Sequence, residues 1–102
     1  MTKIKGKVRQ LFLICREKSL RVTLAESCTG GLICSYLTSV SGSSDIIDRS
    51  YVTYSNEAKT ELLGVPKVLL RKFGAVSKEV AGAMATGAIS RGNCELALSV
   101  TG

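Results

Sequence analysis

The stretch LRVTLAESCTGGLICSYLTSV at positions 20–40 contains the pattern that decides the fold. Its first part, residues 20–26 (LRVTLAE), is mostly apolar and predicts a short buried strand. Residues 27–31 then form a tight turn with two glycines. The apolar residues after the turn recur at helical spacing, at Leu32, Ile33, Tyr36, Leu37 and Val40. A strand, a tight turn and a helix in direct succession indicate an α/β layer structure.

The same alternation continues on both sides of this stretch. Apolar side chains three and four positions apart predict a helix over residues 3–19. Residues 41–45 (SGSSD) form a turn cluster, and residues 46–54 and 94–100 are two further strand candidates. Between these strands, three helical segments begin at Ser55 or Asn56, at Pro66 and at Ser77. We therefore predict one α/β domain over residues 1–102, an α/β/α layered structure with a small central sheet.

The composition is that of an ordinary globular protein, with 45% hydrophobic and 22% charged residues among 102. The chain has no histidine, and its four cysteines, at positions 15, 28, 34 and 94, form no C-x-x-C pair. We therefore expect no metal site. Free thiols and the absence of an apolar run long enough for a bilayer predict a cytoplasmic protein.

The net charge of +6 favours anionic partners such as phosphates, nucleotides or nucleic acid. The alternative is that this excess only keeps a small protein soluble. Lys3, Lys5, Lys7 and Arg9 are evenly spread and have no aromatic residue between them. A nucleic-acid surface usually combines basic and stacking side chains, so we favour solubility and expect no nucleic-acid partner.

The turn after the first strand, Glu26-Ser27-Cys28-Thr29-Gly30-Gly31, is the strongest candidate site. A turn from strand to helix directs backbone N–H groups and the positive end of the helix toward one point. The two glycines allow a ligand to approach the backbone. This geometry predicts an anion or oxyanion site. Many such turns, however, carry Ser, Thr and Gly only to cap a helix.

Three nucleophile candidates lie in this turn: Ser27, Cys28 and Thr29. A hydroxyl needs an activating base, and without histidine a lysine is the natural substitute. Lys59, in the segment YSNEAK, supplies one, and Asn56 would share its helix face. Most lysines, however, are solvated surface residues. We rank Ser27 first because it ends the strand, and Cys28 second because a helix N-terminus can activate a thiol.

Five blocks of the sequence together resemble the CinA C-terminal domain family, the nicotinamide-nucleotide amidases. They are LAESCTGGL at 24–32, VTYSNEAK at 52–59, LLGVP at 62–66, GAVSKEVA at 74–81 and LALSVTG at 96–102. Their order and spacing match those of the family over essentially the whole chain. The resemblance implies hydrolysis of the carboxamide of nicotinamide mononucleotide to nicotinate mononucleotide and ammonia, without a metal or cofactor.

The resemblance also assigns roles to individual residues. Ser27 would be the nucleophile, Lys59 its base and Tyr54 a supporting residue. The substrate-binding residues would be Cys28, Thr29, Gly30, Gly31, Asn56 and Thr101.

The family domain continues beyond the last block, with a glycine- and proline-rich loop and further strands. The resemblance therefore implies that these 102 residues are the front portion of the domain, incomplete at its C-terminus. Two alternatives to a competent amidase remain: a shortened, inactive relative, and a basic nucleotide-binding module without catalysis. Family members commonly form oligomers, so a homo-oligomer is also expected.

Overall fold

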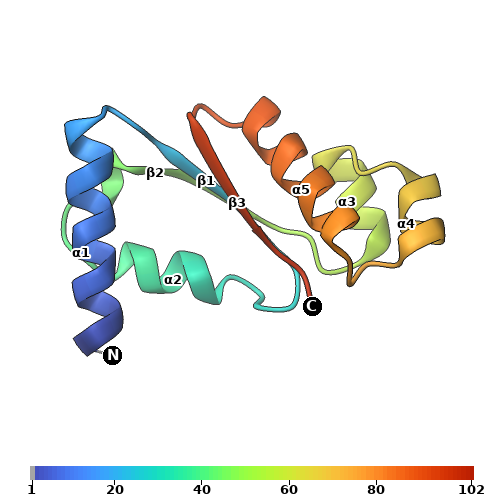
Figure 1. The fold of residues 1–102 in the computed structure, drawn as a ribbon, viewed down its shortest axis with the longest axis horizontal. Coiled ribbons are helices and arrows are strands. Elements are labelled where there is room, and N and C mark those ends of the chain that lie inside the picture. The colour runs from blue at the N-terminus through green and yellow to red at the C-terminus, as the bar shows by residue number, and fades with distance from the viewer. Residues whose placement is uncertain (1) are drawn as a thin grey trace.

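The computed structural model describes residues 2–102 and consists of a three-stranded parallel sheet between two layers of helices (Figure 1). The strand order is β2-β1-β3, with β1 (Val22–Glu26) between β2 (Ile47–Val52) and β3 (Leu96–Val100). One face of the sheet carries α1 (Thr2–Glu17) and α2 (Leu32–Thr38). The other carries α3 (Asn56–Leu63), α4 (Lys67–Phe73) and α5 (Lys78–Arg91). The predicted α/β/α layered fold is confirmed; Met1 lies outside the described residues.

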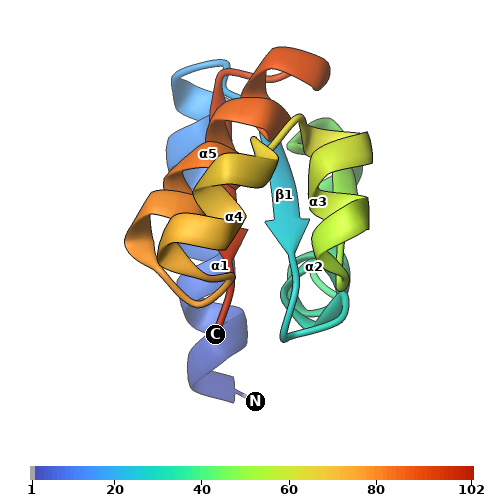
Figure 2. The same cartoon turned by 90° about the vertical axis from the view of Figure 1, so that its right-hand side faces the viewer.

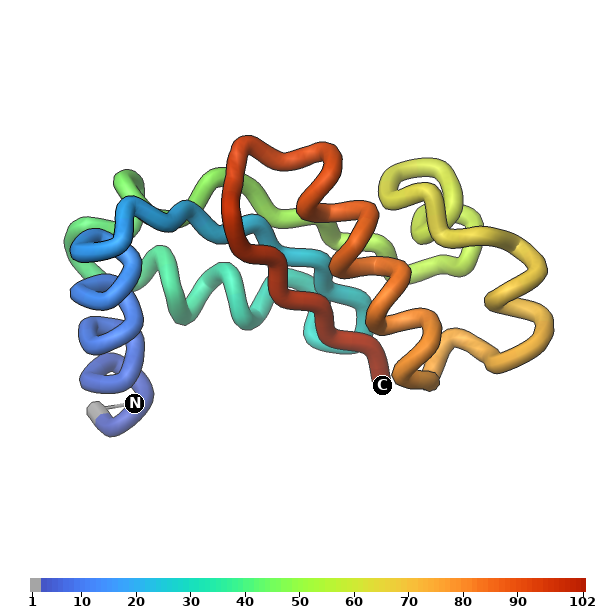
Figure 3. The backbone as a smooth tube through the Cα atoms, turned by 45° about the horizontal axis from the view of Figure 1, so that its top comes forward, coloured from blue at the N-terminus to red at the C-terminus, as the bar shows by residue number. Residues whose placement is uncertain are grey.

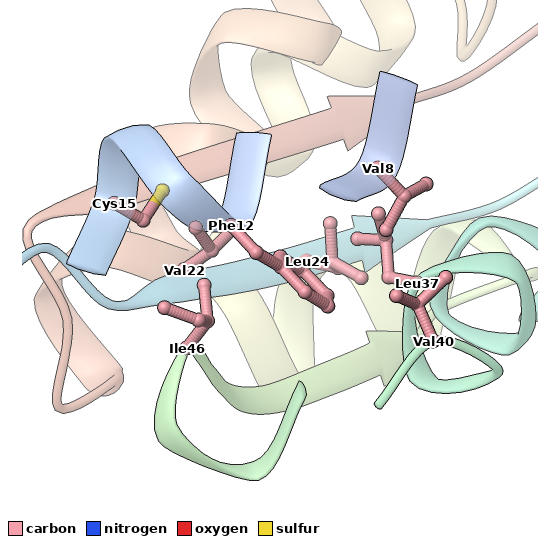
Figure 4. Packing of buried hydrophobic residues seen from close by; sticks show 8 residues of the cluster. All are labelled: Val8, Phe12, Cys15, Val22, Leu24, Leu37, Val40 and Ile46. Atoms are coloured by element: carbon pink, nitrogen blue, oxygen red, sulfur yellow. The ribbon is translucent and has the colours of Figure 1, made fainter. Parts of the chain in front are cut away.

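Each layer of helices encloses its own hydrophobic core against the sheet. Under α1 and α2, the core consists of Val8, Phe12, Cys15, Val22, Leu24, Leu37, Val40 and Ile46 (Figure 4). Under α3, α4 and α5, it consists of Ala25, Leu63, Val65, Leu70, Val80, Met84 and Ala88. The central strand contributes to both cores, and all five of its residues are buried. This burial on both faces is typical of a central parallel strand, and its two polar residues, Thr23 and Glu26, are hydrogen-bonded.

The alternation of side chains along β1 determines which layer each residue reaches. Val22 and Leu24 face α1 and α2, whereas Ala25 lies in the core under α5. By the same alternation, Glu26 faces the α2 side and Ser27 faces the α3 side. The side chains of these two neighbouring residues therefore point into different helix layers.

The three strands are parallel, so their carboxyl ends meet at one edge of the sheet. In Figure 2 the arrow of β1 and the C-terminus both lie at this edge. Figure 3 shows β3 beside β1, although α2, β2 and three further helices separate them in the sequence. The chain leaves β1 toward β2 on one side, and β3 returns on the other. Such a point is where open α/β sheets bind their ligands.

The boundaries of the elements differ only slightly from the predicted ones. All three strands are shorter, and Ser43–Asp45 forms a single turn of 3-10 helix within the predicted turn cluster. Two predicted helix starts are confirmed by hydrogen bonds: the Ser55 hydroxyl accepts from the N–H of Ala58, and the Ser77 hydroxyl accepts from that of Val80. Of the two cysteines that lie among apolar residues, Cys15 is buried in the core and Cys34 is only half-buried.

Candidate active site

Ser27 and Lys59 meet at the carboxyl edge of the sheet. Ser27 follows the last residue of β1, and its backbone N–H donates to the carbonyl of Val100 in β3. Lys59 lies on α3, one helical turn before the buried Leu63, and its side chain is only 1% exposed. The Lys59 Nζ and the Ser27 Oγ are 3.0 Å apart. The structure therefore excludes the alternative that Lys59 is a solvated surface residue.

The Lys59 amine is held by two backbone carbonyls in addition to Ser27. Its Nζ lies 3.0 Å from the Thr53 carbonyl oxygen and 2.9 Å from that of Tyr54. Burial lowers the pKa of Lys59, whereas the nearby Cys28 thiolate would raise it. No carboxylate contacts the amine among the residues that the structure describes. A buried lysine without a countercharge favours its neutral form.

The three contacts of Lys59 fit a neutral amine with a defined orientation. A neutral amine has two N–H groups and one lone pair. The carbonyls of Thr53 and Tyr54 can only accept, so they take both N–H groups. In the observed geometry the Lys59 Nζ also donates to the Ser27 Oγ, and the Ser27 hydroxyl has the Tyr54 carbonyl as its own acceptor at 3.5 Å. When the amine is neutral and its two N–H groups stay on the carbonyls, its lone pair faces the Ser27 hydroxyl. This arrangement can remove a proton from Ser27, as an activated serine requires.

The end of α2 differs from the anion site that the sequence predicted. The Glu26 carboxylate occupies the first turn of this helix, where it accepts hydrogen bonds from the N–H groups of Ile33 and Cys34. It also accepts one from the Thr29 hydroxyl. These helix donors are therefore used within the protein, and they cannot bind an external anion. The expectation of an open anion site at this helix terminus is therefore not met, because the Glu26 side chain turns toward α2 and occupies it.

The environment of Glu26 keeps it ionised. Burial of the carboxyl group acts to raise its pKa, but hydrogen bonds from Thr29 and from the backbone N–H groups of Cys34, Ile33 and Gly31 outweigh this effect. The net result is a pKa below the ordinary value. Glu26 thus supplies a buried negative charge that compensates the positive end of α2.

Two backbone donors of the turn remain available. Within residues 2–102, the N–H groups of Cys28 and Thr29 donate to no other protein group. The next donors along the turn are already bonded, Gly30 to the carbonyl of Ser27 and Leu32 to that of Thr29. Gly30 and Gly31 both have positive φ, a conformation that glycine adopts without strain. The unpaired backbone donors of the turn therefore lie at its start, next to Ser27.

The other predicted site residues lie in different surroundings. Tyr54 contributes its backbone carbonyl to the Ser27–Lys59 pair, while the residue itself is 76% exposed. The Thr101 hydroxyl donates to the carbonyl of Ala75 at 2.8 Å. Asn56 does not accompany Lys59 into the core. It lines a pocket of about 290 Å³ between α3 and α4, whose other lining residues are Glu57, Thr60, Lys67, Leu70 and Arg71.

The sequence led us to expect neither a metal site nor a membrane-spanning segment. Among residues 2–102, no group of three or more His, Cys, Asp or Glu side chains is placed to hold a metal ion. Over the same residues, no helix has both the length and the apolar character needed to cross a membrane.

Two groups at the site were missed by the sequence analysis: the Glu26 carboxylate and the Thr53 carbonyl. For Glu26 a signal existed, since it is the one ionisable residue at the end of an otherwise apolar strand, directly before the turn. For Thr53 no side-chain pattern could have indicated the role, because its backbone oxygen makes the contact.

Comparison with known proteins identifies the family. Residues 4–102 match the profile of the CinA C-terminal domain. A CinA-like protein of Geobacter sulfurreducens is 58% identical over 87 residues, which are 85% of this chain and 21% of that protein. A CinA-like protein of Citrifermentans bemidjiense is 55% identical over 93 residues, 91% of this chain and 22% of that protein.

Solved structures agree. The competence/damage inducible protein CihA from Agrobacterium tumefaciens superposes with a TM-score of 0.94 at 45% identity, covering 97% of this chain and 60% of that one. A CinA superfamily protein from Escherichia coli gives a TM-score of 0.95 at 35% identity, covering 97% and 58%. The chain thus spans about a fifth of the relatives' length and three fifths of the solved chains. By sequence and by structure, the chain belongs to the CinA C-terminal domain family.

Proposed function

We propose that this chain carries the nucleophile and base of a nicotinamide-nucleotide amidase, which hydrolyses the carboxamide of nicotinamide mononucleotide to nicotinate mononucleotide and ammonia. The observation that carries this proposal is the 3.0 Å contact between the Lys59 Nζ and the Ser27 Oγ, at the carboxyl edge of the sheet. Membership of the family supports the choice of substrate.

The first half of the reaction would form an acyl-serine. Lys59, as a neutral amine, takes the proton of the Ser27 hydroxyl while the oxygen attacks the carboxamide carbon. The carbonyl oxygen becomes an oxyanion, for which the free N–H groups of Cys28 and Thr29 are the nearest backbone donors in the sequence. Collapse of this intermediate breaks the C–N bond. The protonated Lys59 then gives its proton to the departing nitrogen, which leaves as ammonia.

The second half would release the acid. A water molecule gives a proton to Lys59 and attacks the acyl-serine carbonyl. The Ser27 oxygen leaves and recovers the proton from Lys59, and the product carries a carboxyl group. One lysine therefore serves as base and acid in turn, which requires that its pKa be close to the working pH. The lowered pKa of Lys59 is consistent with this role.

The flat ring of the substrate needs a complementary surface. Tyr54 is the exposed aromatic residue whose backbone carbonyl contacts Lys59, and its side chain is not needed for that contact. We expect it to pack against the pyridine ring.

The test is incubation of the purified chain with nicotinamide mononucleotide. The proposal expects ammonia and nicotinate mononucleotide in equal amounts. Free nicotinamide, which has the same carboxamide without the ribose phosphate, is the matched control for substrate selection. Nicotinate mononucleotide without ammonia, or no product even from a chain extended to the family's full domain length, would contradict the proposal.

A further inference from the structure

The Glu26 carboxylate has a place in the site that the amidase chemistry does not use. It is 1% exposed and lies at the end of the central strand, in register with Val52 and Val100 of the two neighbouring strands. Its backbone carbonyl accepts from the N–H of Thr53 at 2.9 Å. The residue is therefore fixed to the sheet on both sides before its side chain reaches α2.

The side chain connects this fixed point to the turn and to α2. Its Oε1 accepts from the Thr29 hydroxyl and, at 3.0 Å, from the N–H of Ile33. Its Oε2 accepts from the N–H of Cys34 at 2.9 Å. The residue at the helix N-cap, Gly31, has no side chain that could accept these hydrogen bonds. Glu26 thus connects the end of β1 to the first turn of α2, and the segment between these two points contains Ser27, Cys28 and Thr29.

We propose that Glu26 is a positioning residue that holds the 27–31 turn so that the Ser27 hydroxyl stays on the Lys59 amine and the Cys28 and Thr29 N–H groups stay unpaired. This inference rests on the proposed function of Ser27 as a nucleophile. Two features support it. Without the carboxylate, the donors at the start of α2 would seek other acceptors, and the turn is the nearest part of the chain. The strand alternation that directs Glu26 to α2 also directs Ser27 to α3, so movement of one residue displaces the other.

The substitution Glu26→Gln removes the charge and one acceptor oxygen but keeps the size of the side chain. A glutamine replaces one oxygen by an NH₂ group, which cannot accept. Either Cys34, or Thr29 and Ile33, then loses its partner. Thr29→Val is a milder variant that removes only the hydroxyl bond to Glu26, while Thr29→Ser keeps it. Thr38→Val is the control on the same helix, because the Thr38 hydroxyl bonds to carbonyls within α2, away from the turn.

The readout is labelling of Ser27 by diisopropyl fluorophosphate, followed by mass spectrometry. This reagent reports the reactivity of the serine without needing the rest of the nucleotide pocket. The concentration dependence separates the rate constant of labelling from binding of the reagent. We expect Glu26→Gln to lower the rate constant about a hundredfold, the effect of displacing a reacting group by about 1 Å. Thr29→Val should lower it to a smaller degree, but more than Thr29→Ser does, and Thr38→Val should leave it unchanged.

The outcomes distinguish a failure of the positioning role of Glu26 from a failure of Ser27 as the proposed nucleophile. Wild-type rates in a folded Glu26→Gln variant, as judged by circular dichroism, would overturn the positioning role and leave the nucleophile intact. If Glu26→Gln does not fold, the Thr29 pair decides: equal rates for Thr29→Val and Thr29→Ser would overturn it. A wild-type chain that is never labelled at Ser27 would remove the proposed nucleophile and this inference with it.

Discussion

Ser27 and Cys28 are adjacent, but only one of them contacts the base. Ser27 is 6% exposed and its Oγ lies against Lys59, whereas Cys28 is exposed and donates no bond to the lysine. We predict that Ser27→Ala abolishes ammonia release from nicotinamide mononucleotide, a loss of about a thousandfold or more. Cys28→Ala should keep a substantial part of it. Activity that persists in Ser27→Ala and disappears on thiol alkylation would transfer the role to Cys28.

Lys59 must be neutral to accept the serine proton. Burial lowers its pKa, so below that pKa the amine is protonated and inactive, and kcat/KM should rise as the pH rises through it. Lys59→Met should lower kcat by at least about a hundredfold, the lower range for a general base. A variant with unchanged kcat and a higher KM would indicate that Lys59 only binds substrate.

The same pKa shift affects stability. The folded state binds the Lys59 proton more weakly than the unfolded chain, so the free energy of unfolding should rise with pH between the lowered pKa and the ordinary one. This contribution is complete above the ordinary pKa of lysine and is lost as the pH falls through the folded value. In Lys59→Met this part of the pH dependence should be absent, which denaturant titrations across that interval would measure.

The sequence could predict Ser27 but not the burial of Lys59. A serine at the end of a strand is recognisable from the order of residues alone. A lysine three positions into a helix is usually solvated. Its burial here follows from the packing of α3 against α5, where Lys59 shares the inner face with Leu63. That packing is a tertiary property, as is the turn of Glu26 toward α2.

At the scale of elements, α5 packs against α3 at very short range, and Gly87 makes this possible. A Cβ on Gly87 would overlap with the backbone carbonyl of Leu63, the residue one turn after Lys59. Gly82 lies in the same helix, and a Cβ there would meet nothing within 4 Å. Both glycines therefore lie in α5, but only Gly87 is in close contact with another helix.

We predict opposite effects for the two alanine substitutions in α5. Gly82→Ala should stabilise the protein by about 0.5–1 kcal/mol, because alanine is the better helix former. Gly87→Ala should destabilise it by about 1–3 kcal/mol, because the backbones must separate. Urea titration of both variants measures the difference. Equal stability of the two would mean that α3 and α5 are not in the close contact described.

The starts of the helices were the easiest features to predict, because a capping side chain bonds to an N–H group close to it in the sequence. Ser55 and Ser77 cap α3 and α5 through bonds that span only three residues. The order of the strands could not be predicted in this way. Placing β3 beside β1 depends on α5 packing against both strands, a contact between segments far apart in the sequence. The meeting of Ser27 with Lys59 depends on that order.

At the scale of the whole molecule, one part of the sheet lies uncovered. The side chains of Leu96 and Leu98 are paired in register with Val22 and Leu24, and so face the α1 and α2 side. These two helices cover β1 and β2, and Leu96 and Leu98 remain 41% and 49% exposed. The solved relatives contain further chain beyond the part matched here, since this chain covers 60% and 58% of two of them.

The last prediction concerns how much of the activity these 102 residues carry. Ser27, Lys59 and the free N–H groups of the turn all come from this chain, so the bond-breaking groups can assemble within it. Holding the substrate is a different requirement. Nicotinamide mononucleotide carries a phosphate, and the α2 terminus that could have bound it is occupied by Glu26. The solved relatives contain further chain that has no counterpart in these 102 residues, since this chain covers 60% and 58% of two of them. Correct placement of reactants is worth roughly 7–11 kcal/mol of the barrier, and losing part of it slows the reaction even when the chemistry is intact.

We therefore expect the 102-residue chain to release ammonia much more slowly than a version extended with the C-terminal segment of a relative such as the Geobacter sulfurreducens protein. Labelling of Ser27 by diisopropyl fluorophosphate should proceed at similar rates in both, because the reagent does not need the phosphate site. The comparison requires both proteins in the same assay at saturating substrate, with KM measured for each. Equal turnover of nicotinamide mononucleotide would show that the extension is dispensable for substrate binding. Equal turnover would also mean that residues of this chain bind the phosphate. Lys67 and Arg71, in the pocket between α3 and α4, would then be the first residues to substitute.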